Sequence, residues 1–147
     1  MTCSAHGQNS YLVGADSNDV LRVGSYPAAA VNGKMFHFLA CRTGLTLGLD
    51  LVRNGAKAFF GYTQPYQMMT SEKLSEGFIG CDSVIDLSLT EGDTAGAAQQ
   101  KAISRFESTI ASWEAAGEHT AAVALQQNLD VFVGPQNPGY GNVNTKL

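Results

Sequence analysis

Charged residues are scarce in this chain of 147 residues, because Asp, Glu, Lys and Arg together make up 15% of it, against about 25% in an ordinary domain. The nine Lys and Arg residues are scattered, and the formal net charge is −4. Nucleic-acid binding requires clustered basic side chains that neutralise phosphates. The sequence therefore predicts no nucleic-acid partner.

Long apolar runs and an amino-terminal signal are also lacking. No stretch approaches the ~20 apolar residues of a membrane span, and the chain opens on the polar segment Thr-Cys-Ser-Ala-His instead of a basic and then apolar signal. We therefore expect no membrane partner and a cytoplasmic location. The three cysteines have no CxxC spacing, which argues against a disulfide framework and against a zinc site. No GxGxxG or GxxxxGK[ST] motif occurs, so we expect no cofactor and no metal.

Apolar residues are plentiful enough for one core, since they make up 44% of the sequence. The length suits a single domain, which we place at residues 1–134. From 135 to 147, Pro, Gly and Asn dominate. We expect this tail to be irregular or to be borrowed by a neighbouring chain.

The first half of the domain alternates apolar runs with turn residues. Residues 11–13 and 20–23 are apolar and are separated by polar turn formers, which predicts a β-hairpin. Residues 35–40 form a nearly continuous apolar run, typical of a central parallel strand. A helical stripe over residues 45–52 and a second apolar strand over 57–62 complete a βαβ unit.

Helices are predicted for most of the second half. Apolar positions recur three or four residues apart over 74–89 and again over 95–113, where Thr94 can cap the helix. A shorter Ala-rich helix over 119–127 precedes a final strand over 129–133. The sequence therefore predicts an α/β fold with a mainly parallel sheet.

Cys41 directly follows the predicted central strand, at the sheet edge where open α/β proteins bind ligands. A free thiol has a pKa of about 8.5 and needs a nearby base to act as a nucleophile. His37 lies ~13 Å away along the same strand, at ~3.3 Å per residue, and His119 lies in a polar helical segment. His6 ends a short apolar segment and precedes Gly7, so it can reach the same edge from an adjacent strand. His6 and Cys41 are therefore the candidate catalytic pair.

These residues resemble two motifs of the caspase-like, or clan CD, cysteine peptidases, which include caspases, metacaspases, gingipains, legumains and CHAT domains. Residues 4–7, Ser-Ala-His-Gly, are similar to the family's strand followed by His-Gly. Residues 38–44, Phe-Leu-Ala-Cys-Arg-Thr-Gly, are similar to its strand followed by Ala-Cys-x-x-Gly. Residues 49–61 and 128–134 resemble the helix and strand after the catalytic cysteine and the closing strand. The resemblance covers most of residues 2–134.

The resemblance implies a caspase-like three-layer sandwich and a cysteine endopeptidase that acts on a peptide or protein substrate. It implies that Cys41 is the nucleophile and His6 the general base or acid, while the Gly7 N–H stabilises the oxyanion. The loop after the strand 57–62 lies at the same edge of the sheet, and three of its residues are candidates for substrate contact: Gln64, Tyr66 and Gln67. Asp82 and Asp86 are candidates for an acidic specificity pocket.

The resemblance also implies that part of the domain is missing. Caspase-like domains begin with a further strand, helix and strand, whereas only five residues precede His6. We therefore expect an N-terminally truncated domain whose first strand forms an open sheet edge. The missing strands would lie upstream or on a complementing chain, and the open edge favours a homo-oligomer. A non-catalytic module that keeps the fold and uses this edge for assembly is the alternative function.

Overall fold

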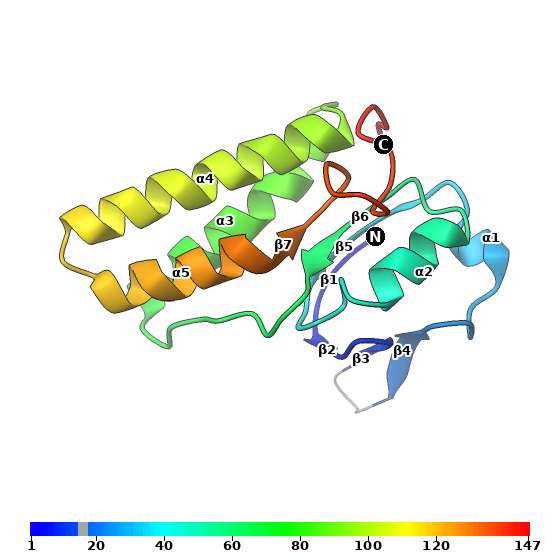
Figure 1. Ribbon diagram of the computed structural model, residues 1–147, viewed down its shortest axis with the longest axis horizontal. Helices are drawn as coiled ribbons and strands as arrows, with labels where there is room; N and C mark the ends of the chain where they lie inside the picture. Colours follow the sequence, from blue (N-terminus) through cyan, green and yellow to red (C-terminus); the bar gives the residue numbers. More distant parts are fainter. Residues whose placement is uncertain (15–17) are drawn as a thin grey trace.

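The computed structural model describes residues 1–14 and 18–147, which form two β-sheets and five helices (Figure 1). The larger sheet has the strand order β1-β5-β6-β7. Its strands are β1 (Thr2–Ser4), β5 (Met35–Leu39), β6 (Ala58–Tyr62) and β7 (Phe132–Val133). β1, β5 and β6 run parallel, and β7 runs antiparallel to β6. The predicted mainly parallel α/β arrangement is thus confirmed.

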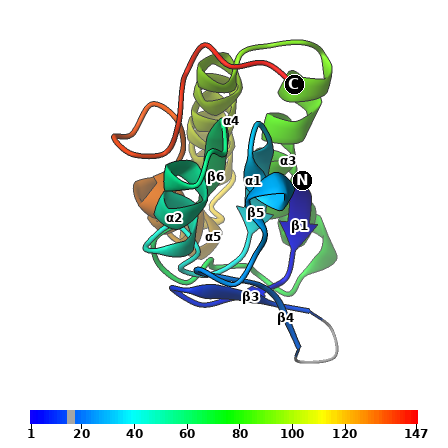
Figure 2. The same cartoon turned by 90° about the vertical axis from the view of Figure 1, so that its right-hand side faces the viewer.

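A smaller antiparallel sheet continues the chain from the end of β1. Its strands are β2 (His6–Gly7), β3 (Tyr11–Val13) and β4 (Asp19–Arg22). β3 and β4 form the predicted hairpin, and the residues between 14 and 18 lie outside the described ranges. In Figures 1 and 2 this small sheet lies below the carboxyl end of β1.

Helices cover both faces of the larger sheet (Figure 1). On one face lie α1 (Ala28–Val31) and α2 (Leu47–Arg53), and on the other lie α3 (Glu72–Thr90), α4 (Ala95–Ala115) and α5 (His119–Val131). The hydroxyl oxygen of Thr94 accepts a hydrogen bond from the Ala97 N–H, which confirms the predicted helix cap. No helix in the described part of the chain is both long and apolar enough to cross a bilayer.

The strands β5 and β6 are buried on both faces, which explains why they are apolar apart from His37. Their side chains alternate between two cores. The core on the α2 face contains Val31, Phe36, Phe38, Leu47, Leu51 and Phe59. The core on the α3 face contains Met35, Phe60, Tyr62, Ile85, Leu89 and Ala98. The unit β5-α2-β6 is therefore the predicted βαβ unit.

One sequence prediction fails at an element boundary. The strand predicted over 129–133 is mostly helix, because α5 continues to Val131 and leaves only Phe132–Val133 extended. Asn128, just before this part of the helix, is fully buried and its side chain binds the backbone of Gln67. The short helix α1 was also not predicted.

Candidate active site

β1 and β5 end at the same edge of the sheet. Ser4 pairs with Leu39, and the Ala5 N–H donates to the Leu39 oxygen at 3.4 Å. His6 and Cys41 each lie two residues beyond the paired Ser4 and Leu39. The structure therefore places both residues at the carboxyl edge, as the sequence predicts.

Gly7 brings the two segments into direct backbone contact. A Cβ atom built on Gly7 would lie 2.4 Å from the carbonyl oxygen of Cys41 and 2.8 Å from Cγ2 of Thr43. Both separations are shorter than any ordinary Cβ contact. Only glycine therefore allows the residue after His6 to approach the Cys41 backbone this closely.

The Gly7 N–H is directed away from the small sheet. The Gln8 N–H donates to the Tyr11 oxygen at 2.9 Å, and Gly7 pairs with Leu12 at the next position. Because hydrogen-bonded and non-bonded pairs alternate along an antiparallel ladder, Gly7 and Leu12 form a non-bonded pair. The Gly7 N–H is thus a donor beside Cys41 that β3 does not use. Such a donor suits the oxyanion of an acyl-transfer reaction.

The His6 side chain is exposed and lies on the opposite face of β2 from the Gly7 contact. It lines a surface cavity of about 490 Å³ whose other lining residues are Cys3, Ser4, Ala5, Val13 and Gly14. Among the described residues, no hydrogen bond joins the His6 imidazole to the Cys41 thiol. The imidazole and the thiol do not form a pair in this state, and catalytic hydrogen bonds are often long before substrate binds.

Cys41 begins a tight turn that leads into α2. Arg42 has a φ of 58°, and it is the one non-glycine residue with positive φ in the described ranges. A non-glycine residue in this region costs on the order of 1–3 kcal/mol and persists only where the surroundings enforce it. The Arg42 N–H donates to the Gln64 oxygen at 3.3 Å, and the Thr43 hydroxyl donates to the Ala40 oxygen at 3.1 Å. This strained residue could not be predicted from the sequence, since arginine seldom adopts this conformation.

The loop after β6 runs beside this turn. Gln64 and Gln67 are exposed and line a cavity of about 260 Å³, with Pro65, Gln127, Asp130 and Val131. Tyr66 is turned inward, because its ring packs on Tyr62 with centroids 4.7 Å apart and its hydroxyl donates to the Phe78 oxygen at 2.9 Å. Of the three candidates for substrate contact, the two glutamines are thus the exposed ones.

Asn128 fixes this loop and was missed by the sequence prediction. Its side-chain oxygen accepts from the Gln67 N–H at 2.7 Å, and its amide nitrogen donates to the Gln67 oxygen at 2.8 Å. The signal that could have found it is an asparagine within the apolar stripe of a helix, because a buried amide requires partners.

Asp82 and Asp86 do not form an acidic pocket beside Cys41. Asp86 Oδ2 lies 3.1 Å from Nδ1 of His37, and Asp82 Oδ1 lies 3.1 Å from its Nε2. The carboxylates also accept hydrogen bonds from the hydroxyls of Tyr62 and Thr2, at 2.6 Å each. Both carboxylates are therefore committed to a network centred on a histidine that is 2% exposed.

Charge explains why this network is stable in the core. Burial alone would lower the pKa of His37, but the close carboxylate of Asp82 and then that of Asp86 outweigh burial and raise that pKa to about 9. Burial acts to raise the pKa of Asp86, but the hydrogen bond and charge of His37 outweigh it and hold that pKa below its ordinary value. His37 is accordingly a buried cation at neutral pH. In this state it contributes to the fold and does not act as a general base.

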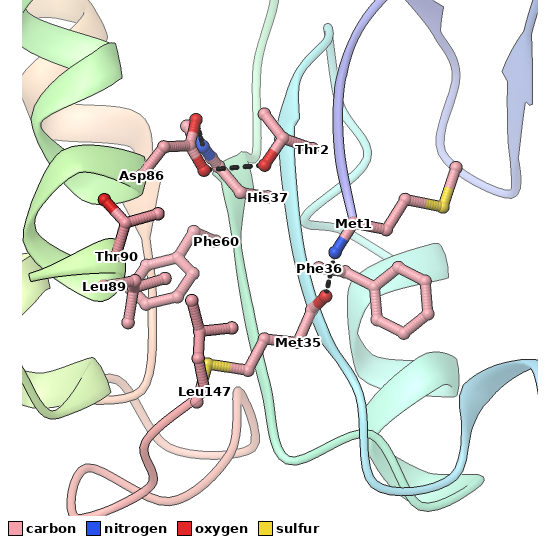
Figure 3. A pocket seen from close by; sticks show the side chains of 10 residues that line it. All are labelled: Met1, Thr2, Met35, Phe36, His37, Phe60, Asp86, Leu89, Thr90 and Leu147. Carbon is pink, nitrogen blue, oxygen red and sulfur yellow. Dashed lines mark hydrogen bonds and ion pairs between the residues drawn. The ribbon is translucent and has the colours of Figure 1, made fainter. Parts of the chain in front are cut away.

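A separate cavity of about 170 Å³ adjoins this network, and Figure 3 shows the ten side chains that line it. It lies at the start of β5, where the Met1 amine donates to the Met35 oxygen at 2.7 Å. Both oxygens of Asp86 are already engaged, by Thr2 and His37, and most other lining groups are apolar. This cavity therefore lies at the opposite end of β5 from Cys41. Asp86 has no unused oxygen there to bind a ligand.

The two other cysteines occupy different surroundings. Cys81 is fully buried within α3, its Sγ lies 3.4 Å from Thr109 Oγ1, and burial raises the pKa of its thiol. Cys3 is half-buried in β1. His119 is exposed, and its Nδ1 lies 2.6 Å from Oε2 of Glu114. No group of three or more His, Cys, Asp or Glu side chains in residues 1–14 and 18–147 is arranged to hold a metal ion.

Comparisons with known protein families, with curated proteins and with solved structures find no match to this chain. The function must therefore be inferred from the geometry at the carboxyl edge.

Proposed function

We propose that this chain is a caspase-like cysteine endopeptidase domain, or part of one, that hydrolyses peptide bonds through Cys41 and His6. The observation that carries the proposal is the backbone contact between Gly7 and Cys41 at the shared carboxyl edge of β1 and β5. It places the Gly7 N–H, which the small sheet leaves unused, beside the Cys41 backbone, and His6 directly precedes Gly7 in the chain.

The chemistry assigned to these groups is an acyl transfer. The Cys41 sulfur attacks the carbonyl carbon of the substrate while His6 accepts the thiol proton. The Gly7 N–H stabilises the negative charge that develops on the carbonyl oxygen. His6 then gives its proton to the departing amine, which leaves an acyl-enzyme on Cys41. Water, deprotonated by His6, attacks the thioester and releases the carboxylic acid and the free thiol.

The strained turn gives additional support to Cys41 as the nucleophile. Strained backbone clusters at active sites, where it sets the direction of a reacting group. Arg42, directly after Cys41, carries the strain, whereas the segments around Cys3 and Cys81 are an ordinary strand and helix. Of the three thiols, Cys41 is therefore the best placed.

Substitution of each group tests the proposal. Peptides with Arg, Lys, Asp or Asn before the scissile bond should be cleaved by the wild type and not by Cys41→Ala, because no other group can form the acyl-enzyme. His6→Ala should retain a thiol without its proton acceptor and lose most activity. Cys81→Ala is the control, since its sulfur faces the core of the three-helix layer. Activity surviving in Cys41→Ala would refute the assignment.

A second candidate function is that of a non-catalytic assembly module, and the open edge of β1 favours it. The His37 N–H donates to the Met1 oxygen and the Ala5 N–H to the Leu39 oxygen, so these alternate residues of the first segment face β5. The backbone groups of Ser4 must then point outward, to the unpaired side. Such an edge accepts a strand from a complementing chain or from a second copy of this chain.

Ser4→Pro separates the two candidates. Proline is tolerated on an edge strand where its missing N–H would face solvent. This variant should therefore keep the β1 and β5 pairing but block strand addition. If the chain is an assembly module, light scattering should show an oligomer in the wild type and a monomer in Ser4→Pro. A monomeric wild type would count against assembly through this edge.

A further inference from the structure

The C-terminal tail returns to the sheet and reaches the turn that carries Cys41. After β7 the chain runs back beside β6 (Figure 1), where Gly141 forms a bridge with Ala58. The Phe59 N–H donates to the Tyr140 oxygen at 3.0 Å. Tyr140 is 8% exposed, and its ring packs on Phe59 with centroids 6.2 Å apart. The tail is thus irregular in backbone but part of the core.

The hydroxyl of Tyr140 has a partner in the Cys41 turn. It donates to the carbonyl oxygen of Gly44 at 2.8 Å in a buried setting. The N–H of Gly44 donates to the Tyr62 oxygen at 2.9 Å. Both polar backbone groups of Gly44 are therefore satisfied from outside the turn, one by the strand β6 and one by the tail.

This hydrogen bond bears on the strained residue next to Cys41. Arg42 lies two residues before Gly44 and keeps its positive φ only if the turn is held on both sides. The Gln64 oxygen holds Arg42 itself, and Tyr62 and Tyr140 hold Gly44. Loss of the Tyr140 hydroxyl would leave the buried Gly44 oxygen without this donor. The turn would then relax, because an unpaired buried oxygen is costly.

We propose that Tyr140 is a positioning residue for Cys41, because its hydroxyl, through Gly44, holds the turn that presents the thiol at the carboxyl edge. The inference rests on the proposed function of Cys41 and adds the C-terminal tail to the active centre. The ring and the hydroxyl have separable roles: the ring fills the core beside Phe59, and the hydroxyl fixes the turn.

Tyr140→Phe tests the hydroxyl alone, because it keeps the ring. The measurement is the rate of alkylation of Cys41 by iodoacetamide, determined on its peptide by mass spectrometry, relative to that of Cys3 in the same sample. We expect the ratio of the two rates to change by about tenfold, since a displacement of the order of 1 Å at a reacting group costs up to about 10²-fold. Thermal unfolding is recorded in parallel.

Tyr26→Phe is the matched control. Tyr26 also packs against the core on the α2 face, and its hydroxyl donates to Asp50 of α2 rather than to the Cys41 turn. This variant should lose stability without changing the ratio of the alkylation rates by more than about twofold.

Replacement of Tyr140 by 4-aminophenylalanine supplies the rescue, because its amino group donates from the position of the hydroxyl. The ratio should return toward the wild-type value in this variant. If the ratio is the same in Tyr140→Phe, in the amino variant and in the wild type, the hydroxyl has no positioning role. If Cys41 of the wild type reacts no faster than Cys3, the peptidase proposal is contradicted. The positioning role of Tyr140 is tested separately, by the change in the ratio between the variants.

Discussion

Gly7→Ala places a single methyl group at the contact on which the proposed site depends. The new Cβ atom would lie 2.4 Å from the Cys41 carbonyl oxygen, 2.8 Å from Thr43 Cγ2 and 2.9 Å from Ala40 Cβ. Gly7 does not have a positive φ, so alanine can adopt its backbone conformation. The effect of the substitution is therefore steric alone.

The size of the effect follows from these separations. An ordinary contact begins at 3.4 Å, so the two segments must separate by about 1 Å. The segment that carries Cys41 can move little, because Arg42 is bonded to Gln64 and the preceding strand, β5, lies in the middle of the sheet. A displacement of about 1 Å between a donor and the reacting group lowers kcat/KM by about 10²-fold. Overpacking of this kind costs about 1–3 kcal/mol in the free energy of unfolding.

Cleavage of the peptide panel and urea unfolding measure the two quantities, and Gly80→Ala is the control. Gly80 lies within α3, and a Cβ built there meets no atom within 4 Å. Alanine at this position should leave cleavage unchanged and stabilise the protein by about 0.5–1 kcal/mol. Gly7→Ala with wild-type cleavage and wild-type stability would refute the close contact between Gly7 and Cys41.

Two further expectations concern the network centred on His37 and the loop after β6. Because the pKa of His37 is raised from about 6.5 in the unfolded chain to about 9 in the fold, the stabilisation from its charge is fully present below pH 6.5 and is lost between about pH 6.5 and 9. Urea unfolding should show stability falling over this range in the wild type and not in His37→Gln, and equal slopes would contradict the buried cation. Asn128→Ala removes both bonds to the Gln67 backbone and should cost about 1–3 kcal/mol. It should raise KM more than it lowers kcat, whereas an unchanged KM would remove Gln67 from the substrate site.

The parts of the fold that were predictable are those where burial controls the sequence locally. β5 and β6 are buried on both faces and are apolar apart from His37, and the stripes of α3 and α4 must repeat with the helical period. The end of α5 was not predictable, because Val131 and Phe132 are equally apolar. At the end of α5, Phe132 pairs with Tyr62 of β6, and Thr63 donates to the Val131 oxygen from its N–H and its hydroxyl, contacts with a segment far away in the sequence.

The candidate site shows the same division. The positions of His6 and Cys41 at one edge follow from two strand ends, which a sequence pattern can locate. The positive φ of Arg42 and the hydrogen bond from Tyr140 to Gly44 cannot be read from local patterns. They depend on contacts between segments that are far apart in the chain, and a composition rich in Pro, Gly and Asn made the tail resemble an unpacked end.

The alkylation rate of Cys41 relative to Cys3 at neutral pH, in the wild type and in His6→Gln, tests whether His6 and Cys41 act as a pair. If His6 accepts the proton of Cys41, Cys41 should react at least about tenfold faster than Cys3 in the wild type. This advantage should disappear in His6→Gln. Equal rates for the two cysteines in the wild type, or an advantage of Cys41 that survives in His6→Gln, would contradict the account.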